Sequence, residues 1–275
     1  MKDAKTPREG TLIAREGTLI DRDAADERPR LAEELVSFVA PASLEADQYR
    51  TLRHAVERLR RDSDFQVFAI TSAGAGDGKT VTTLNLAGSL AQSSESRVLV
   101  VCADLHRAAA TEYLGLARAP GLAETILNEE YGLAQAVRRL DSLNVSVLPA
   151  GDPHARPYEL LASPRIEGLL AEARRLYDYV LIDTPPVVPL ADCRLLGRWV
   201  DGFLVVVAAH KTPRKLLAEA LNLLEPAKVL GVVFNGDDQP ISPYYGYYGH
   251  QHRPSRASAR PSVWWRRALK QQRHP

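Results

Sequence analysis

Short apolar runs recur along the middle of the chain, and segments with helical spacing lie between them. Continuous apolar runs of this kind are typical of strands that are buried on both faces. Because strands and helices alternate, we expect an α/β fold with a doubly wound, mostly parallel sheet and helices on both of its faces. The runs cover residues 65–70, 97–102, 143–148, 179–183, 201–209 and 229–234.

The helices are predicted from apolar positions that recur every three or four residues. Residues 31–40 have this pattern, Pro41 interrupts it, and Ser43 can cap a second helix over residues 43–62. Further helices are expected directly after the first strand, as short pieces within 121–140, over 159–177 with a break near Pro164, and over 213–224.

The two ends of the chain differ in composition from the middle. Residues 1–30 are polar and contain two copies of REGTLI, which are too few for a repeat fold. From Gln239 onward there is no acidic residue, and a tyrosine-rich stretch precedes a basic segment with a Trp pair. We therefore expect a disordered tail over 1–30, one domain over 31–238 and a flexible tail over 239–275.

Charge and cysteine content narrow the class of protein. A formal net charge of +1 gives no sign of a nucleic-acid partner. The two cysteines, Cys102 and Cys193, have no zinc spacing and form no disulfide framework, which suits a reducing compartment. No apolar run reaches the roughly 20 residues of a membrane span. We expect a cytoplasmic protein without a transmembrane segment, whose membrane contact would come through a partner or a tail.

The sequence TSAGAGDGKT after the first apolar run predicts a P-loop, because a strand precedes it and a helix follows it. Its glycines let backbone amides turn toward phosphates, and the helix N-terminus adds a favourable dipole. Ala73 stands where the usual first glycine would be. The expected nucleotide-binding residues are Gly74, Ala75, Gly76, Asp77, Gly78, Lys79, Thr80 and Val81.

Two carboxylates follow strands at the edge of the sheet where ligands bind in open α/β folds. Asp183 ends the run YVLID, which reads as a Walker B element, and Asp104 follows the run RVLVVC. Asp104 could instead be a helix cap. We predict that Lys79, Asp104 and Asp183 are catalytic and that Thr80, Asp104 and Asp183 hold Mg²⁺.

Taken together, the segments TSAGAGDGKT, VCADLHR and VLIDTPP resemble the bacterial tyrosine kinases, which are P-loop autokinases tied to exopolysaccharide synthesis and export. Asp192 falls where that family has another aspartate. The segment DQYRTLR resembles the family's oligomerisation motif, with Asp47, Arg50 and Arg53 on one helix side. Spacing alone favours a solvated charged surface for these three residues, whereas the resemblance favours an oligomer interface.

The resemblance implies ATP and Mg²⁺ as cofactors and a ring of subunits that phosphorylate one another. It also implies activation by a membrane polysaccharide co-polymerase and reversal by a phosphotyrosine phosphatase. The tail looks most like that of cytosolic autokinases from exopolysaccharide loci linked to protein-sorting systems. The expected phosphate acceptors are Tyr244, Tyr245, Tyr247 and Tyr248.

One position departs from the family pattern, which has an aspartate where this chain has Cys102. A neutral thiol is a poor Mg²⁺ ligand, because Mg²⁺ prefers oxygen. A kinase with reduced activity and a nucleotide-binding scaffold of the export machinery therefore both remain open.

A partitioning or positioning ATPase is a further alternative, although that class has a second P-loop lysine where this chain has Gly74. Asn235, after the last strand, lies where related ATPases read the adenine, and Asn-Gly is also a common turn. The basic tail either contacts an anionic membrane surface or is simply solvated.

Overall fold

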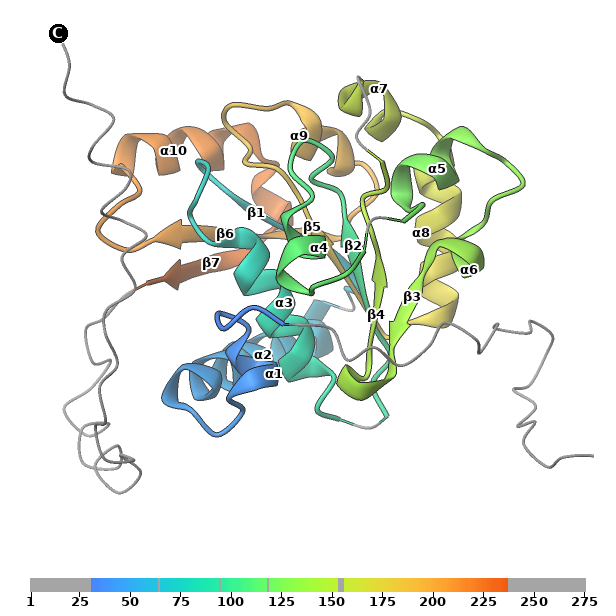
Figure 1. The fold of residues 1–275 in the computed structure, drawn as a ribbon. Coiled ribbons are helices and arrows are strands. Elements are labelled where there is room, and N and C mark those ends of the chain that lie inside the picture. Colours follow the sequence, from blue (N-terminus) through green and yellow to red (C-terminus); the bar gives the residue numbers. More distant parts are fainter. Residues whose placement is uncertain (1–30, 64, 94, 118, 153–155, 237–275) are drawn as a thin grey trace, which may run out of the picture. The chain divides into compact units, whose positions relative to one another are not determined.

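The computed structural model describes residues 31–236 apart from 64, 94, 118 and 153–155. In this part of the chain one sheet has the strand order β3-β4-β2-β5-β1-β6-β7 (Figure 1). The expected tails, 1–30 and 239–275, lie outside the described residues. The strands are β1 (Val67–Ser72), β2 (Val98–Cys102), β3 (Arg138–Leu140), β4 (Val145–Leu148), β5 (Tyr179–Asp183), β6 (Gly202–Ala208) and β7 (Val229–Asn235).

Every strand pair in this sheet is parallel except β3 with β4. The sequence predicted short helical pieces over 121–140. The last three residues of that segment, Arg138–Leu140, instead form the antiparallel edge strand β3. A single turn of 3₁₀-helix at Asp141–Leu143 and a left-handed Asn144, with φ 54°, return the chain directly to β4. This tight connection makes the pair antiparallel.

The helices largely follow the predicted spacing. The expected helix over 31–40 is shorter, because only Val36–Val39 is helical, and the segment 159–177 is divided into two helices at Pro164. Helices of this part of the chain are α1 (Val36–Val39), α2 (Leu44–Ser63), α3 (Lys79–Leu90), α4 (Ala109–Tyr113), α5 (Leu122–Leu127), α6 (Leu133–Ala136), α7 (Pro157–Leu161), α8 (Arg165–Leu176), α9 (Asp192–Leu196) and α10 (Arg214–Leu223), with a 3₁₀ turn at Pro226–Lys228.

The sheet carries helices on both faces, as the alternation of strands and helices predicted. From β1 the chain crosses over α3 toward β2, whereas from β6 it crosses over α10 in the opposite direction toward β7. Right-handed crossovers in opposite directions place their helices on opposite faces of the sheet. Accordingly α3, with α1 and α2 packed against it, lies on one side, and α8 and α10 lie on the other (Figure 1). The strand order reverses next to β1, where the P-loop begins.

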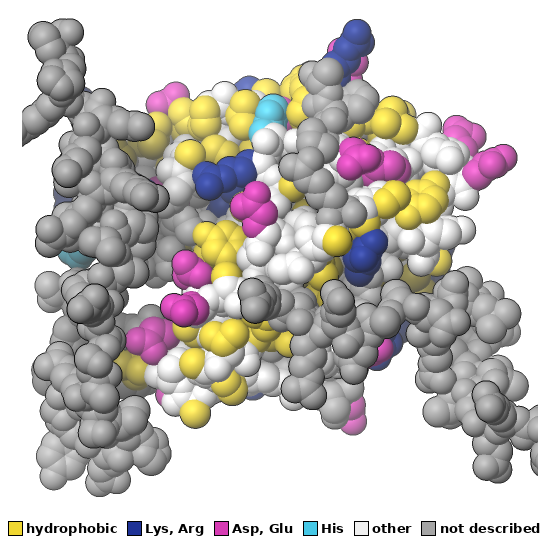
Figure 2. All heavy atoms as spheres, viewed as in Figure 1, with side chains coloured by type: hydrophobic (Ala, Val, Ile, Leu, Met, Phe, Trp, Pro, Cys, Tyr) yellow, Lys and Arg dark blue, Asp and Glu magenta, His cyan; other side chains and the backbone are white. Residues whose placement is uncertain are grey.

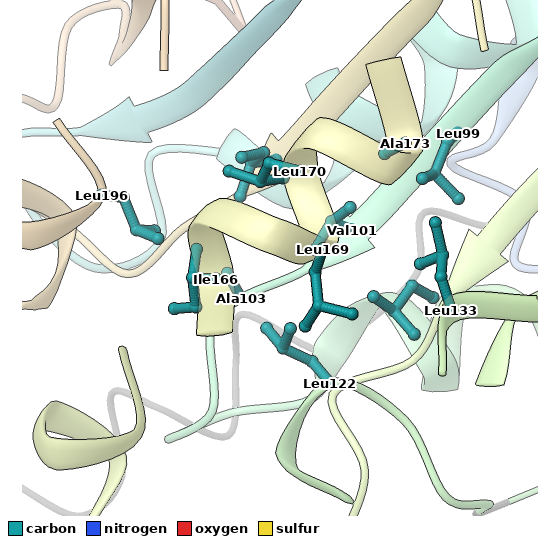
Figure 3. Close-up of a pocket in the computed structure, with 12 residues that line it drawn as sticks. Leu99, Val101, Ala103, Leu122, Leu133, Ile166, Leu169, Leu170, Ala173 and Leu196 are labelled. Carbon is teal, nitrogen blue, oxygen red and sulfur yellow. The ribbon is translucent and has the colours of Figure 1, made fainter. Parts of the chain in front are cut away.

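The core is close-packed and contains no ligand-sized cavity in the region between β2 and α8. All five side chains of β2 and of β5 are buried. A cavity of about 20 Å³ lies between Leu99 and Val101 of β2 and Leu169 and Leu170 of α8 (Figure 3). That volume is about one water molecule, and the lining is apolar, so the cavity stays dry and offers no substrate site.

The N-terminal helices are attached to α3 by polar contacts. The buried Asn85 side chain accepts from the Ser37 amide at 2.8 Å and donates to the Glu34 carbonyl at 2.9 Å. Gly88 has no side chain, and the Phe38 ring fills that space, since a Cβ there would lie 2.5 Å from the ring. The segment before the P-loop strand is therefore fixed on the helix that follows the P-loop.

Candidate active site

The P-loop joins β1 to α3 through two residues in the left-handed region of backbone space. Gly76 has φ 79° and Gly78 has φ 92°, and both values favour glycine. The helix begins at Lys79, so the free amides of its first turn face the carboxyl end of the sheet. Ala73, at the usual first glycine, is fully buried and accommodated. The sequence motif thus folds into a strand, a turn rich in free amides and a helix N-terminus.

Lys79 reaches across from the P-loop to the residue that follows β2. Its Nζ lies 2.8 Å from Asp104 Oδ2, and the two side chains are only 13% and 6% exposed. Asp104 Oδ1 accepts from the Arg107 amide at 3.1 Å, so this carboxylate also caps its own loop. The charged pair links the two predicted catalytic residues directly.

Thr80 and Asp183 meet at the adjoining strand end. Thr80 Oγ1 donates to Asp183 Oδ2 at 2.9 Å. Burial, only partly offset by Lys79 and Thr80, raises the pKa of Asp183 to about 6. Asp183 Oδ1 is buried and has no hydrogen-bond partner among the described residues. An unpaired carboxylate oxygen beside a hydroxyl is the oxygen-rich environment that Mg²⁺ prefers, so these residues fit a magnesium ion.

Cys102 ends β2 directly beside this group. It is 2% exposed and is the register partner of Asp183 in the parallel pair of β2 with β5. Burial, and then the negative charges of Asp183 and Asp104, raise the pKa of the Cys102 thiol. Cys102 therefore stays a neutral thiol near pH 7 and supplies neither a negative charge nor a base.

A histidine in the loop after β2 and an aspartate at the start of α9 form a second polar pair. His106 Nε2 lies 2.6 Å from Asp192 Oδ2, and the Asp192 side chain is 4% exposed. Asp192 was noted in the sequence, whereas His106 was not assigned a role. Its place four residues beyond a strand end, in the ligand crevice of such folds, is the signal that could have identified it.

Side chains from the ends of β6 and β7 contact the outer side of the P-loop. Lys211 Nζ donates to the Gly76 carbonyl at 3.0 Å, and Thr212 Oγ1 donates to Asp77 Oδ1 at 2.9 Å. Asn235 Nδ2 donates to the Asp77 carbonyl at 3.1 Å. Asn235 was expected either to read the adenine or to form a turn, and its side-chain amide here supports the loop. Lys211 and Thr212 were not assigned a role, and both lie in the turn after β6.

The residues predicted for an oligomer interface lie on α2, and all three make contacts within the chain. Arg50 pairs with Asp47 and donates to the Pro41 carbonyl at 2.6 Å. Arg53 Nη1 donates to the Ser89 carbonyl at the end of α3, at 3.0 Å. Arg53 is therefore a structural residue of the subunit as well as an interface candidate. The four predicted phosphate-acceptor tyrosines, Tyr244, Tyr245, Tyr247 and Tyr248, lie outside the described residues.

The described surface is mixed in charge, in keeping with the net charge of the chain. On the face in Figure 2, basic side chains are interspersed with acidic ones and with small apolar areas. None of the described helices is long and apolar enough to cross a membrane.

The doubly wound sheet and the P-loop at its switch point define a P-loop nucleotide-binding protein. The family described as an AAA domain matches residues 65–212 of the chain. The chain is 34% identical over 222 residues to tyrosine-protein kinase YwqD of Bacillus subtilis (strain 168), which covers 80% of this chain and 93% of that relative. It is 33% identical over 224 residues to the succinoglycan biosynthesis transport protein ExoP of Rhizobium meliloti, which covers 78% of this chain but only 28% of ExoP.

A solved structure agrees with these relatives. The kinase domain of Escherichia coli tyrosine kinase ETK superposes with a TM-score of 0.68 at 26% identity, covering 76% of this chain and 83% of that chain. The chain therefore belongs to the family of bacterial tyrosine-protein kinases, as its P-loop and Walker B segments suggested. The activity of that family is the phosphorylation of protein tyrosines.

Proposed function

We propose that this chain transfers a phosphoryl group from Mg-ATP to tyrosines of its own C-terminal segment, with one subunit acting on another. The observation that carries the proposal is the arrangement of Lys79, Thr80, Asp104 and Asp183 at adjacent strand ends, with one Asp183 oxygen left without a partner. A buried carboxylate oxygen costs free energy unless something satisfies it, and a bound cation would do so.

Each of these residues has a separate task in the proposed reaction. Bound Mg-ATP supplies the phosphoryl group and the charge that stabilises its transfer. Thr80 and Asp183 would hold the metal ion, and the P-loop amides with Lys79 would bind the phosphates. Asp104 would accept the proton of the incoming tyrosine hydroxyl through Oδ2, which Lys79 now holds at 2.8 Å and would release when its ammonium turns to the phosphates.

A second candidate function is a nucleotide-binding scaffold with little or no kinase activity. Cys102 favours it, because a buried neutral thiol stands where the family has an aspartate. Losing one positioned carboxylate can lower a rate by about 10²–10⁴. The scaffold and the kinase share the nucleotide site and differ only in the transfer step.

The biological setting that we propose is the control of exopolysaccharide synthesis or export. ExoP, as its name states, is a biosynthesis transport protein for succinoglycan, and the matched part of this chain corresponds to 28% of it. We propose that a separate membrane co-polymerase activates the chain at the inner face of the plasma membrane. The active form would be a ring of subunits, and a phosphotyrosine phosphatase would reset it.

The test of transfer between subunits uses two variants that are inactive alone. Lys79→Met keeps the tyrosines but loses the phosphate-binding ammonium, whereas a chain ending at Gln239 keeps the P-loop but lacks the four tyrosines. We expect phosphotyrosine in residues 240–250 of the Lys79→Met chain only when the two are mixed with Mg-ATP. Modification of wild type but not of the mixture would contradict transfer between subunits, and mass spectrometry of the tail peptides distinguishes the two results.

A further inference from the structure

Three side chains, one at the start of the P-loop motif and two from distant segments, donate to backbone carbonyls of the P-loop. Ser72 Oγ donates to the Gly74 carbonyl at 2.7 Å, Lys211 Nζ to the Gly76 carbonyl at 3.0 Å and Asn235 Nδ2 to the Asp77 carbonyl at 3.1 Å. They come from three different elements, which are the end of β1, the turn after β6 and the last residue of β7. The P-loop is therefore fixed by residues far apart in the sequence.

These contacts determine the direction of the loop amides. The described residues contain no cis peptide bond, and in a trans peptide the carbonyl and the N–H of the next residue point in opposite directions. A donor that holds the Gly76 carbonyl therefore turns the Asp77 amide away from that donor, and Asn235 acts on the Gly78 amide in the same way. Amides aimed to one side of a loop form the concave site that binds anions.

The turn that carries Lys211 is itself attached to the loop. Thr212 Oγ1 donates to Asp77 Oδ1 at 2.9 Å and accepts from the Ala208 amide at 2.9 Å. Asp77 Oδ2 in turn accepts from the Gly74 amide at 3.0 Å, so the Asp77 carboxylate joins the turn to the start of the loop. Lys211 is thus held at the Gly76 carbonyl by more than its own hydrogen bond.

The side-chain amide of Asn235 packs directly against the backbone of Gly78. A Cβ on Gly78 would lie 1.9 Å from Asn235 Nδ2, so the asparagine amide occupies the space that any side chain at 78 would need. Gly78 also has φ 92°, which favours glycine. Asn235 can therefore take this position only because residue 78 is a glycine.

We propose that Lys211 and Asn235 are positioning residues that set the P-loop amides in their phosphate-binding direction before nucleotide binds. This inference rests on the proposed function, in that the anion is a nucleotide phosphate. Lys211 is exposed, so its removal opens no cavity in the core, and its loss acts on phosphate binding rather than on folding. Preorganised donors increase affinity because no reorganisation is needed on binding.

The affinities of three ligands distinguish a residue that positions the loop amides from one that reads the adenine or contacts the terminal phosphate. A residue that sets loop amides affects every ligand with a diphosphate group equally, whereas a residue that reads the adenine affects only nucleotides. A lysine that contacts the terminal phosphate affects ATP more than ADP. We would measure dissociation constants for Mg-ATP, Mg-ADP and inorganic pyrophosphate by calorimetry in wild type, Lys211→Met, Lys211→Arg and Asn235→Ala. Lys215→Met, an exposed lysine on α10, is the matched control.

We expect Lys211→Met and Asn235→Ala to weaken all three ligands by a similar factor of about three to ten, as the loss of one hydrogen bond predicts. Lys211→Arg should restore most of the affinity, and Lys215→Met should change nothing. Equal affinity of Lys211→Met and Lys215→Met, or a loss confined to ATP or to nucleotides, would overturn the proposal.

A second measurement needs no nucleotide and so separates this inference from the proposed function. Amide hydrogen exchange of residues 73–80 in the nucleotide-free protein should be faster in Lys211→Met and in Asn235→Ala than in Lys215→Met, with unchanged thermal unfolding for Lys211→Met. Unchanged exchange rates would refute the proposal that Lys211 and Asn235 position the P-loop. Failure of wild type to bind any nucleotide would instead refute the proposed function.

Discussion

Cys102 and Asp183 are register partners at the carboxyl ends of β2 and β5, so their side chains lie on the same face of the sheet. Thr80 of α3 contacts Asp183 on that face. Asp183 and Asp104 are already two buried carboxylates in this site. An aspartate in place of Cys102 would add a third, directly beside Asp183.

Cys102→Asp should make the protein dependent on magnesium for its stability. Without metal, the added buried carboxylate should lower the free energy of unfolding by about 2–4 kcal/mol, because neighbouring negative charges repel in a buried site. Mg-ATP should recover most of this loss and, if the missing carboxylate limits the rate, raise phosphotyrosine formation at least tenfold. Thermal unfolding with and without Mg-ATP checks this, with Cys102→Ser as the control. Equal metal responses of the two variants would refute the prediction.

The Lys79–Asp104 pair should contribute to stability as well as to phosphate binding. Both side chains are largely buried, so removing one partner leaves an uncompensated charge. We expect Lys79→Met alone to lower the free energy of unfolding by about 3 kcal/mol, and Lys79→Met with Asp104→Asn to recover about half of it. Denaturant unfolding of the nucleotide-free variants measures the coupling. Losses of stability that simply add in the double variant would show that the pair is not coupled. Because the predicted loss is large, Lys79 variants used as inactive controls must also be checked for folding.

Asp201 should make stability depend on pH in the acid range. Burial raises the pKa of Asp201, but hydrogen bonds from Arg174 and from the Gln66 and Val67 amides outweigh it and lower the pKa overall. A carboxyl with a lowered pKa in the folded state stabilises the protein above its unfolded value of about 3.9, and this stability is lost as pH falls through the folded pKa.

The variant that tests this is Asp201→Asn. We expect it to cost about 2 kcal/mol at neutral pH, with the difference from wild type shrinking below about pH 4. Asp141→Asn removes an exposed pair with Arg139 and should change stability by less than about 0.5 kcal/mol. A wild-type advantage over Asp201→Asn that stays constant down to about pH 2 would disprove the linkage.

Variants at Arg50 and Arg53 should distinguish effects on oligomer assembly from effects on the stability of the single subunit. Arg53 Nη1 donates to the Ser89 carbonyl and the side chain is only 18% exposed, whereas Arg50 is 30% exposed and pairs locally with Asp47. We expect Arg53→Ala to lose about 1–2 kcal/mol of stability and Arg50→Ala less than about 0.5 kcal/mol. Both should reduce oligomer formation in sedimentation velocity. A fully assembled Arg50→Ala protein would remove Arg50 from the interface.

Much of the fold could be predicted because its signals are local. Each central strand is a continuous apolar run, and the P-loop motif fixes the order of strand, turn and helix around Lys79. Asp104 and Asp183 could be brought together from sequence because parallel strands end at one edge of a sheet. The edge strand β3 gave no signal, since Arg138–Leu140 is three residues long and mostly exposed.

The outer support of the site could not be predicted, since it depends on contacts between distant segments. Lys211 and Gly76 are 135 residues apart, Asn235 and Asp77 are 158 apart, and His106 and Asp192 are 86 apart. A lysine or an asparagine after a strand has no motif of its own, and only the strand order brings β6 and β7 beside the P-loop.

The most direct test of the central claim is phosphotyrosine formation by the purified full chain with Mg-ATP. We expect incorporation of phosphate at Tyr244, Tyr245, Tyr247 or Tyr248, detected by mass spectrometry, and none in Lys79→Met or Asp183→Asn at matched concentration. Wild-type protein that binds Mg-ATP in calorimetry but forms no phosphotyrosine, while Cys102→Asp does form it, would contradict the kinase account and favour the nucleotide-binding scaffold.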